Sequence, residues 1–65
     1  MVINKFIKDS LEEQGKSIEY VSNRTGYTLE RLDDIINCRS SVMPVEAENI
    51  LNTLGITLGN VIYSI

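Results

Sequence analysis

The chain has 65 residues, of which 43% are apolar and 23% are charged. A chain this short buries only about 60% of the surface that its unfolded form exposes, so it has room for one small core and no second domain. Its net charge of −3 and its lack of histidine exclude a His-based catalytic triad and an imidazole metal site, and it lacks the basic excess usual in nucleic-acid binders.

The first predicted helix covers the segment before Gly15. Ile3, Ile7 and Leu11 recur every four residues and form an apolar stripe, and most of the charged residues lie outside it. Glycine adopts the left-handed conformation that ends a helix without steric cost. We therefore expect this helix to stop at Gln14 and Gly15.

Two shorter helices follow, and each has a hydroxyl side chain at its start. Ser17 is suited to cap a helix over residues 18–25, and Thr28 is suited to cap one over residues 29–37, because Ser and Thr oxygens accept from the first backbone N–H groups of a helix. The apolar residues expected to face the core are Ile18, Val21, Leu32, Ile35 and Ile36, with Tyr20 as a further candidate.

A fourth helix is predicted to begin at Pro44, because the fixed φ of proline suits the first helical position, and to stop at Gly55. Thr57 is suited to cap one or two further turns. The apolar residues expected on the buried side of these last helices are Val45, Ala47, Ile50, Leu51, Leu54, Leu58, Val61 and Ile62. We predict an all-α fold, a compact bundle of about five short helices forming a single domain over residues 1–65.

No targeting segment is apparent in the sequence. Residues 1–14 mix charged residues into their apolar positions and lack a small-residue cleavage site. No apolar run approaches the roughly 18 residues that a membrane span requires. We therefore expect a cytoplasmic protein without membrane contact.

The sequence contains few features that indicate catalysis. One cysteine, Cys38, excludes an internal disulfide, and without histidine it makes a zinc site implausible. Adjacent carboxylates such as Asp33 and Asp34 point about 100° apart on a helix and do not converge on a substrate. We expect no enzyme activity, no cofactor and no metal.

The second and third predicted helices, joined by the turn T-G-Y, form the basic unit of a helix-turn-helix over about residues 17–37. Nearly the whole chain resembles the Cro/CI-type, lambda-repressor-like helix-turn-helix family. The motifs that carry this resemblance are Gly15-Lys16-Ser17, Gly26-Tyr27-Thr28, Pro44 and Leu54-Gly55-Ile56-Thr57-Leu58.

The resemblance implies a small transcriptional regulator that binds duplex DNA, with the helix that begins at Thr28 in the major groove. Such single-domain regulators are similar to those of phages and mobile elements, and two-fold homodimers are common among helix-turn-helix proteins. The positions that read bases in the family correspond to Thr28, Leu29, Glu30 and Asp34. The positions that hold phosphates correspond to Ile18, Asn37 and Arg39, and Arg31 is expected to contact phosphates as well.

Acidic residues on the third predicted helix keep a second hypothesis open. Glu30, Asp33 and Asp34 are opposed by only Arg31 and Arg39, so residues 28–39 carry a formal charge of −1. Phosphate neutralisation supplies essentially all non-specific DNA affinity, and this surface opposes it. The alternative function is a modulator, of antirepressor or co-repressor type, that binds a partner repressor protein through this helix instead of binding DNA.

If the acidic residues are merely a solvated face, the phosphate contacts come from basic residues elsewhere. The candidates are Lys5, Lys16, Arg24 and Arg39. Leu29 is ambiguous in the same way, because an exposed leucine can contact a thymine methyl group or an apolar groove of another protein.

Cys38 stands where the resembling family usually has glycine after its recognition helix. Because asparagine tolerates the left-handed conformation, we expect Asn37 to adopt it in place of the missing glycine. Cys38 is interpreted as a small, half-buried side chain, with a redox-sensing thiol beside Arg39 as the alternative.

The end of the chain is rich in apolar residues. Val61 and Ile62 are expected in the core, with Tyr63 and Ile65 exposed. Alternatively, this segment forms a dimer contact or a docking patch, because small domains rarely hide so much apolar surface alone.

Overall fold

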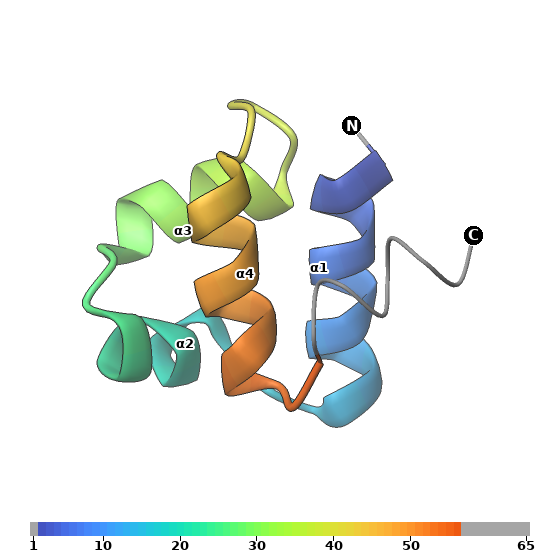
Figure 1. Cartoon of the computed structure of the whole chain (residues 1–65), viewed down its shortest axis with the longest axis vertical. Coiled ribbons are helices and arrows are strands. Elements are labelled where there is room, and N and C mark those ends of the chain that lie inside the picture. Colours follow the sequence, from blue (N-terminus) through green and yellow to red (C-terminus); the bar gives the residue numbers. More distant parts are fainter. Residues whose placement is uncertain (1, 57–65) are drawn as a thin grey trace.

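Four helices make up the described part of the chain. The structure is a computed structural model, and it describes residues 2–56. In chain order the helices are α1 (Val2–Gln14), α2 (Ile18–Thr25), α3 (Leu29–Ile36) and α4 (Pro44–Thr53) (Figure 1). No strand occurs between residues 2 and 56, so the all-helical class is confirmed. The fifth helix predicted after Thr57 lies outside the described residues.

The helix boundaries follow from the capping residues that the sequence provides. Ser17 Oγ accepts a hydrogen bond from the Tyr20 N–H at 3.3 Å, and this satisfies one of the donors that the first turn of α2 leaves unpaired. Gly15 follows the end of α1 with a φ of 66°, in the left-handed region where glycine carries no steric penalty. The predicted starts of α2, α3 and α4 and the predicted stop of α1 are confirmed.

All four helices contribute apolar side chains to one core. Ile35, Ile50 and Leu51 are fully buried, and burial of each such side chain stabilises the fold by about 1.5–3 kcal/mol. The buried apolar residues are Ile7, Leu11, Val21, Leu32, Ile35, Val42, Ala47, Ile50, Leu51 and Leu54. Partly buried Ile3, Phe6, Ile18, Tyr20, Tyr27, Ile36 and Ile56 pack against them.

The prediction that Val45 is buried was wrong. Its side chain is 59% exposed, because the buried stripe of α4 runs through Ala47, Ile50, Leu51 and Leu54, and Val45 lies about 200° around the helix from Ala47. Val42, which precedes α4 and was not predicted to be in the core, is buried.

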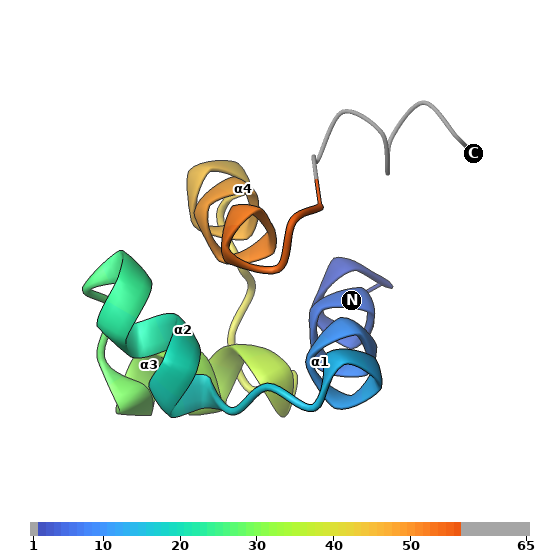
Figure 2. The same ribbon diagram turned by 90° about the horizontal axis from the view of Figure 1, so that it is seen from below.

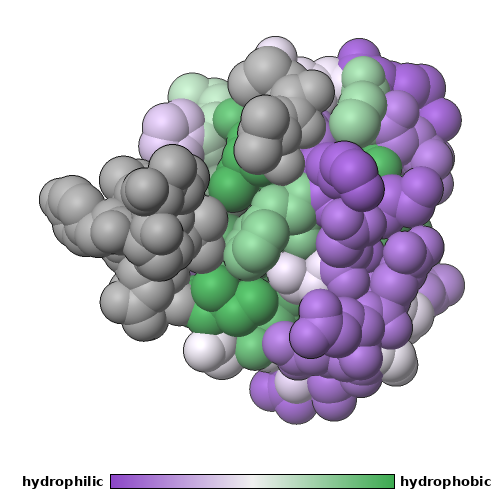
Figure 3. Space-filling model, turned by 90° about the vertical axis from the view of Figure 1, so that its right-hand side faces the viewer, coloured by the Kyte–Doolittle hydropathy of each residue, from purple (hydrophilic) through white to green (hydrophobic). Residues whose placement is uncertain are grey.

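The helices are arranged so that α2 and α3 share one side of the core. Seen from below, α4 lies across the core from α3, and α1 closes the remaining side (Figure 2). On the face drawn in Figure 3, apolar side chains form a strip beside a band of hydrophilic ones. None of the helices in the described part is both long and apolar enough to cross a bilayer.

Candidate functional site

A tight turn determines how α3 follows α2. Gly26 has a φ of 85°, a left-handed conformation, and its N–H donates to the Ser22 carbonyl at 2.9 Å. Ser22 Oγ donates to the carbonyl of Tyr27 at 2.6 Å, and Thr25 Oγ1 accepts from the Tyr27 N–H at 3.2 Å. These hydrogen bonds pair the backbone polar groups of the turn with residues of α2, and they fix the direction in which α3 starts.

The beginning of α3 presents an exposed surface. Thr28, Leu29 and Glu30 are all exposed, and Leu29 is 44% exposed. Thr28 Oγ1 also accepts from the Arg31 N–H at 3.1 Å as the helix cap. The next apolar residues of α3, Leu32 and Ile35, are buried, so this short helix has one face in the core and one face available to a ligand.

Arg31 is held by a partner that the sequence analysis did not anticipate. Its Nε donates to Glu46 Oε2 at 2.9 Å and its Nη2 to Glu46 Oε1 at 2.7 Å, which is a bidentate pair between α3 and α4. Its Nη1 donates to Ser40 Oγ at 2.6 Å and its Nη2 to the Ser41 carbonyl at 2.9 Å. A guanidinium with four such bonds positions the loop before α4.

Hydrogen bonds from the Arg31 side chain and from the Met43 backbone N–H lower the pKa of Glu46, since both stabilise the ionised carboxylate. The Met43 N–H reaches Glu46 Oε1 at 2.9 Å. The glutamate therefore satisfies the backbone N–H of the N-cap residue of α4 while it binds Arg31. The Glu46 carboxylate thus accepts hydrogen bonds from Arg31 on α3 and from Met43 at the start of α4.

Arg39 is engaged by both aspartates at the end of α3. Its Nε donates to Asp34 Oδ1 at 3.0 Å, and its Nη2 donates to Asp33. Hydrogen bonds to Asp34 and then Asp33 raise the pKa of Arg39. Asn37 Nδ2 donates to Asp33 Oδ1 at 3.0 Å, so this amide belongs to the same group. The charged side chains of this group are about half-exposed, and ion pairs of this kind contribute little to stability.

The expectation that Asn37 is left-handed was wrong. Asn37 has a φ of −96°, whereas Cys38 has a φ of 59°. The left-handed residue is therefore Cys38, and Asn37 serves as the helix C-cap. The prediction that Cys38 is half-buried was also wrong, since its side chain is exposed.

The remaining predicted residue, Ile18, begins α2 and is half-buried against the core. The structure thus brings Thr28, Leu29 and Glu30 together at the start of α3, and groups Asp34, Asn37 and Arg39 at its end. Ile18 lies on a different helix and offers no polar atom from its side chain. Arg31 is bound within the fold.

Asn4 is a structural residue that the sequence analysis missed. It is fully buried in α1, and its Nδ2 donates to the Ile35 carbonyl at 2.8 Å and to the Ser40 carbonyl at 3.0 Å. It therefore ties α1 to the end of α3. The only signal in the sequence was its place beside Ile3 and Ile7, where an asparagine interrupts the buried side of an apolar helix.

A cationic ridge, formed by Lys16 and Arg24 around the ring of Tyr20, lies along α2 and the turn before it. Lys16 Nζ lies 4.5 Å from the centre of the Tyr20 ring, and Arg24 Cζ lies 4.3 Å from it. Both contacts are cation–π interactions. Within residues 2–56 neither cation forms an ion pair, whereas Lys5, Arg31 and Arg39 all do.

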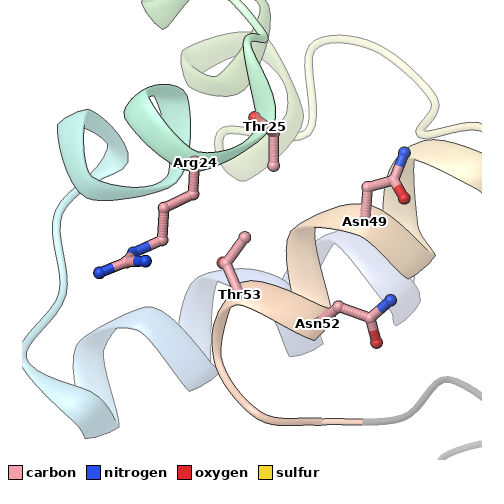
Figure 4. A pocket seen from close by; sticks show the side chains of 5 residues that line it. All are labelled: Arg24, Thr25, Asn49, Asn52 and Thr53. Atoms are coloured by element: carbon pink, nitrogen blue, oxygen red, sulfur yellow. The ribbon is translucent and has the colours of Figure 1, made fainter.

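An open hollow continues from this ridge to α4 (Figure 4). Its volume is about 480 Å³, and it is lined by Arg24, Thr25, Asn49, Asn52 and Thr53. No carboxylate is among these lining residues. Within the described range, no group of three or more potential ligands is placed to hold a metal ion.

Comparisons of the chain with protein-family models, with curated proteins and with solved structures found no match.

Proposed function

We propose that the chain is a helix-turn-helix transcriptional regulator that binds duplex DNA through the exposed start of α3. The observation that carries the proposal is the short α2–turn–α3 segment, in which Gly26 is left-handed and Thr28 caps a helix whose first residues are exposed. Such a pair crosses the phosphate backbone with its first helix and inserts its second helix into the major groove. The Cro/CI-type resemblance of the sequence supports the same function.

Leu29 and Glu30 are the side chains proposed to read bases. A carboxylate accepts from cytosine N4, and a leucine contacts the methyl group of thymine. Thr28 caps the helix and is proposed to contact DNA from its position at the N-terminus of α3. Asp34, near the end of α3, and Arg39, in the loop after it, pair with each other.

Selection of binding sites from a pool of random duplexes tests this function. The wild-type protein is expected to enrich one motif, and Glu30→Ala is expected to relax the preference at one base pair. A good side-chain contact to a base discriminates by about 1–3 kcal/mol. As a control, Glu48→Ala removes an exposed carboxylate from α4 and should leave the motif unchanged. Failure of the wild-type protein to enrich any motif would overturn the proposal.

A second candidate function is favoured by the ion pairs of α3. Arg31 and Arg39 are bound by carboxylates, whereas Glu30 is exposed and has no ion pair among residues 2–56. This leaves the carboxylate of Glu30 beside the exposed Leu29. An exposed apolar side chain next to a carboxylate is complementary to the basic DNA-reading face of a repressor, and such complementarity accelerates association.

The charge-reversed variant Glu30→Lys/Asp34→Lys separates the two functions. It raises non-specific DNA affinity under either, because it adds positive charge near the phosphates. Only under the second function does it abolish binding to a purified Cro/CI-type repressor domain with a basic recognition helix. Unchanged binding of the reversed variant to that domain would eliminate the second function.

A further inference from the structure

The DNA-binding function requires a source of phosphate affinity, and α3 does not provide it. Arg31 is held by Glu46, Ser40 and Ser41, and Arg39 is held by Asp33 and Asp34. Non-specific affinity for DNA depends on cations that neutralise phosphates. In an acidic chain those cations must be concentrated on one surface if they are to act together.

The Lys16–Tyr20–Arg24 ridge places two cations on one surface. Tyr20 and Arg24 are four residues apart on α2, so they lie along one stripe of that helix, and Lys16 reaches the same ring from the turn before Ser17. Both cations contact the same ring, at 4.5 and 4.3 Å from its centre, and the ring restricts where two otherwise flexible side chains can point. Both cations are exposed. They are therefore available to a ligand while being held near each other.

The hollow beside Arg24 extends this surface with neutral donors. Thr25 Oγ1 donates to the Val21 carbonyl and Thr53 Oγ1 to the Ile50 carbonyl, so these two hydroxyl hydrogens are already used. Asn52 makes no side-chain hydrogen bond within residues 2–56, and Asn49 uses one amide N–H to bind Tyr27 Oη at 2.8 Å. The amides and the guanidinium are among the groups that contact DNA phosphates.

We propose that the Lys16–Tyr20–Arg24 ridge and the adjoining Asn52 form the phosphate-binding surface of the protein, which holds the backbone of the duplex that α3 reads. This inference rests on the proposed DNA-binding function. It moves the phosphate contacts from Ile18, Asn37 and Arg39 to the exposed cations around Tyr20 on α2, the helix that crosses the backbone in this arrangement. Affinity then comes from α2 and base preference from α3.

Salt-dependent binding to a non-specific duplex tests the ridge. The variant Lys16→Gln/Arg24→Gln is compared with Lys5→Gln/Lys8→Gln, which removes the same charge from exposed positions of α1. Binding of each to a duplex of roughly 30 base pairs is measured by fluorescence anisotropy between about 50 and about 200 mM salt. Circular dichroism checks that each variant remains helical.

The ridge variant is expected to lower the slope of log affinity against log salt by about 2, since each phosphate contact accounts for about one unit. The α1 variant should change the slope by much less. The conservative variant Lys16→Arg/Arg24→Lys should retain the wild-type slope. This pattern distinguishes local phosphate contacts from a general effect of net charge.

Two results would overturn the inference in different ways. If the wild-type protein binds with a salt-dependent affinity and both double variants weaken it equally, the ridge is not the phosphate surface, and the proposed function stands. If the wild-type protein does not bind the duplex even at the lowest salt, both the ridge assignment and the proposed function are wrong.

Discussion

Arg31 and Glu46 are 15 residues apart in sequence, yet they form a two-bond ion pair with distances of 2.9 and 2.7 Å. The glutamate side chain is 14% exposed. The pair joins α3 to the first turn of α4 across the loop that separates them. It assigns to Arg31 a structural role, and it leaves the exposed start of α3 with the carboxylate of Glu30 as its charge.

Glu46→Gln is expected to lower the melting temperature at neutral pH and to have less effect in acid. The folded-state pKa of Glu46 is lowered, chiefly by its bond to Arg31. Its contribution to stability is therefore complete above the ordinary carboxyl pKa of about 4.3, and it is lost as the pH falls below that value through the folded-state pKa.

Thermal denaturation of both proteins across the acidic range checks this. The difference in melting temperature between wild type and Glu46→Gln should shrink as the pH falls. Glu48→Gln, on an exposed position of the same helix, should show little difference at any pH. A constant difference for Glu46→Gln would mean that ionisation of this carboxylate does not stabilise the fold.

Cys38→Gly is expected to stabilise the fold. Cys38 has a φ of 59°, and the left-handed conformation costs a residue with a Cβ about 1–2 kcal/mol. Part of this gain is offset because glycine loses more entropy on folding. We expect a net increase of about 0.5–1 kcal/mol in the free energy of unfolding, measured in urea.

Asn37→Gly is the matched control for the substitution at Cys38. Asn37 has a φ of −96° and donates through Nδ2 to Asp33, so a glycine there removes bonds and relieves no strain. It should destabilise the fold. Stabilisation by Asn37→Gly and not by Cys38→Gly would show that Asn37 is the left-handed residue.

Asn4→Ala is expected to destabilise the fold by about 1–3 kcal/mol. The substitution removes the donor of a buried hydrogen bond to the Ile35 carbonyl and of a part-buried one to the Ser40 carbonyl. The Ile35 carbonyl keeps the Cys38 N–H as a donor, and the buried Asn4 Oδ1, which has no partner within residues 2–56, is removed with the side chain. In a domain this small, such a loss is a large fraction of the free energy of unfolding. Chemical denaturation monitored by circular dichroism measures it.

Asn23→Ala serves as the comparison for Asn4, because Asn23 is exposed on α2. Surface substitutions of this kind usually change stability by less than about 0.5 kcal/mol. A similar small effect for Asn4→Ala would mean that the link between α1 and the end of α3 contributes little to stability.

Leu29→Ala is expected to separate binding from stability. Leu29 is 44% exposed at the start of α3, so truncating it should change the free energy of unfolding by less than about 0.5 kcal/mol. It should nevertheless weaken binding to the selected DNA motif. Leu32→Ala, in the same helix but buried, should cost about 2–5 kcal/mol of stability. Unchanged DNA affinity for Leu29→Ala would exclude this side chain from the interface.

The fold was predictable where one residue decides a local structure. Ser17, Thr28 and Pro44 each specify a helix start through a cap or a fixed φ, and the structure has helices beginning directly after Ser17 and Thr28 and at Pro44. The apolar spacing of four residues identified Ile7 and Leu11 as core. These features depend on neighbours within one helical turn, which a sequence displays directly.

The features that were not predictable depend on contacts between distant segments. The partner of Arg31 is on α4, and the carbonyls bound by Asn4 are 31 and 36 residues away. The sequence pattern placed the left-handed residue after α3 at Asn37, which is one position too early. Asn37 is the C-cap of the helix, and the left-handed residue is Cys38. A count of charges along the sequence likewise does not reveal that carboxylates bind Arg31 and Arg39. Nor does it reveal that Lys16 and Arg24 both contact the Tyr20 ring.

The most direct test of DNA binding is fluorescence anisotropy of the wild-type protein with duplexes that span its own coding and upstream regions. The salt concentration is varied from about 50 to about 200 mM. We expect one preferred fragment, bound with an affinity that falls steeply as the salt concentration rises. No binding to any fragment at the lowest salt would contradict this expectation and would leave α3 as a surface for another protein.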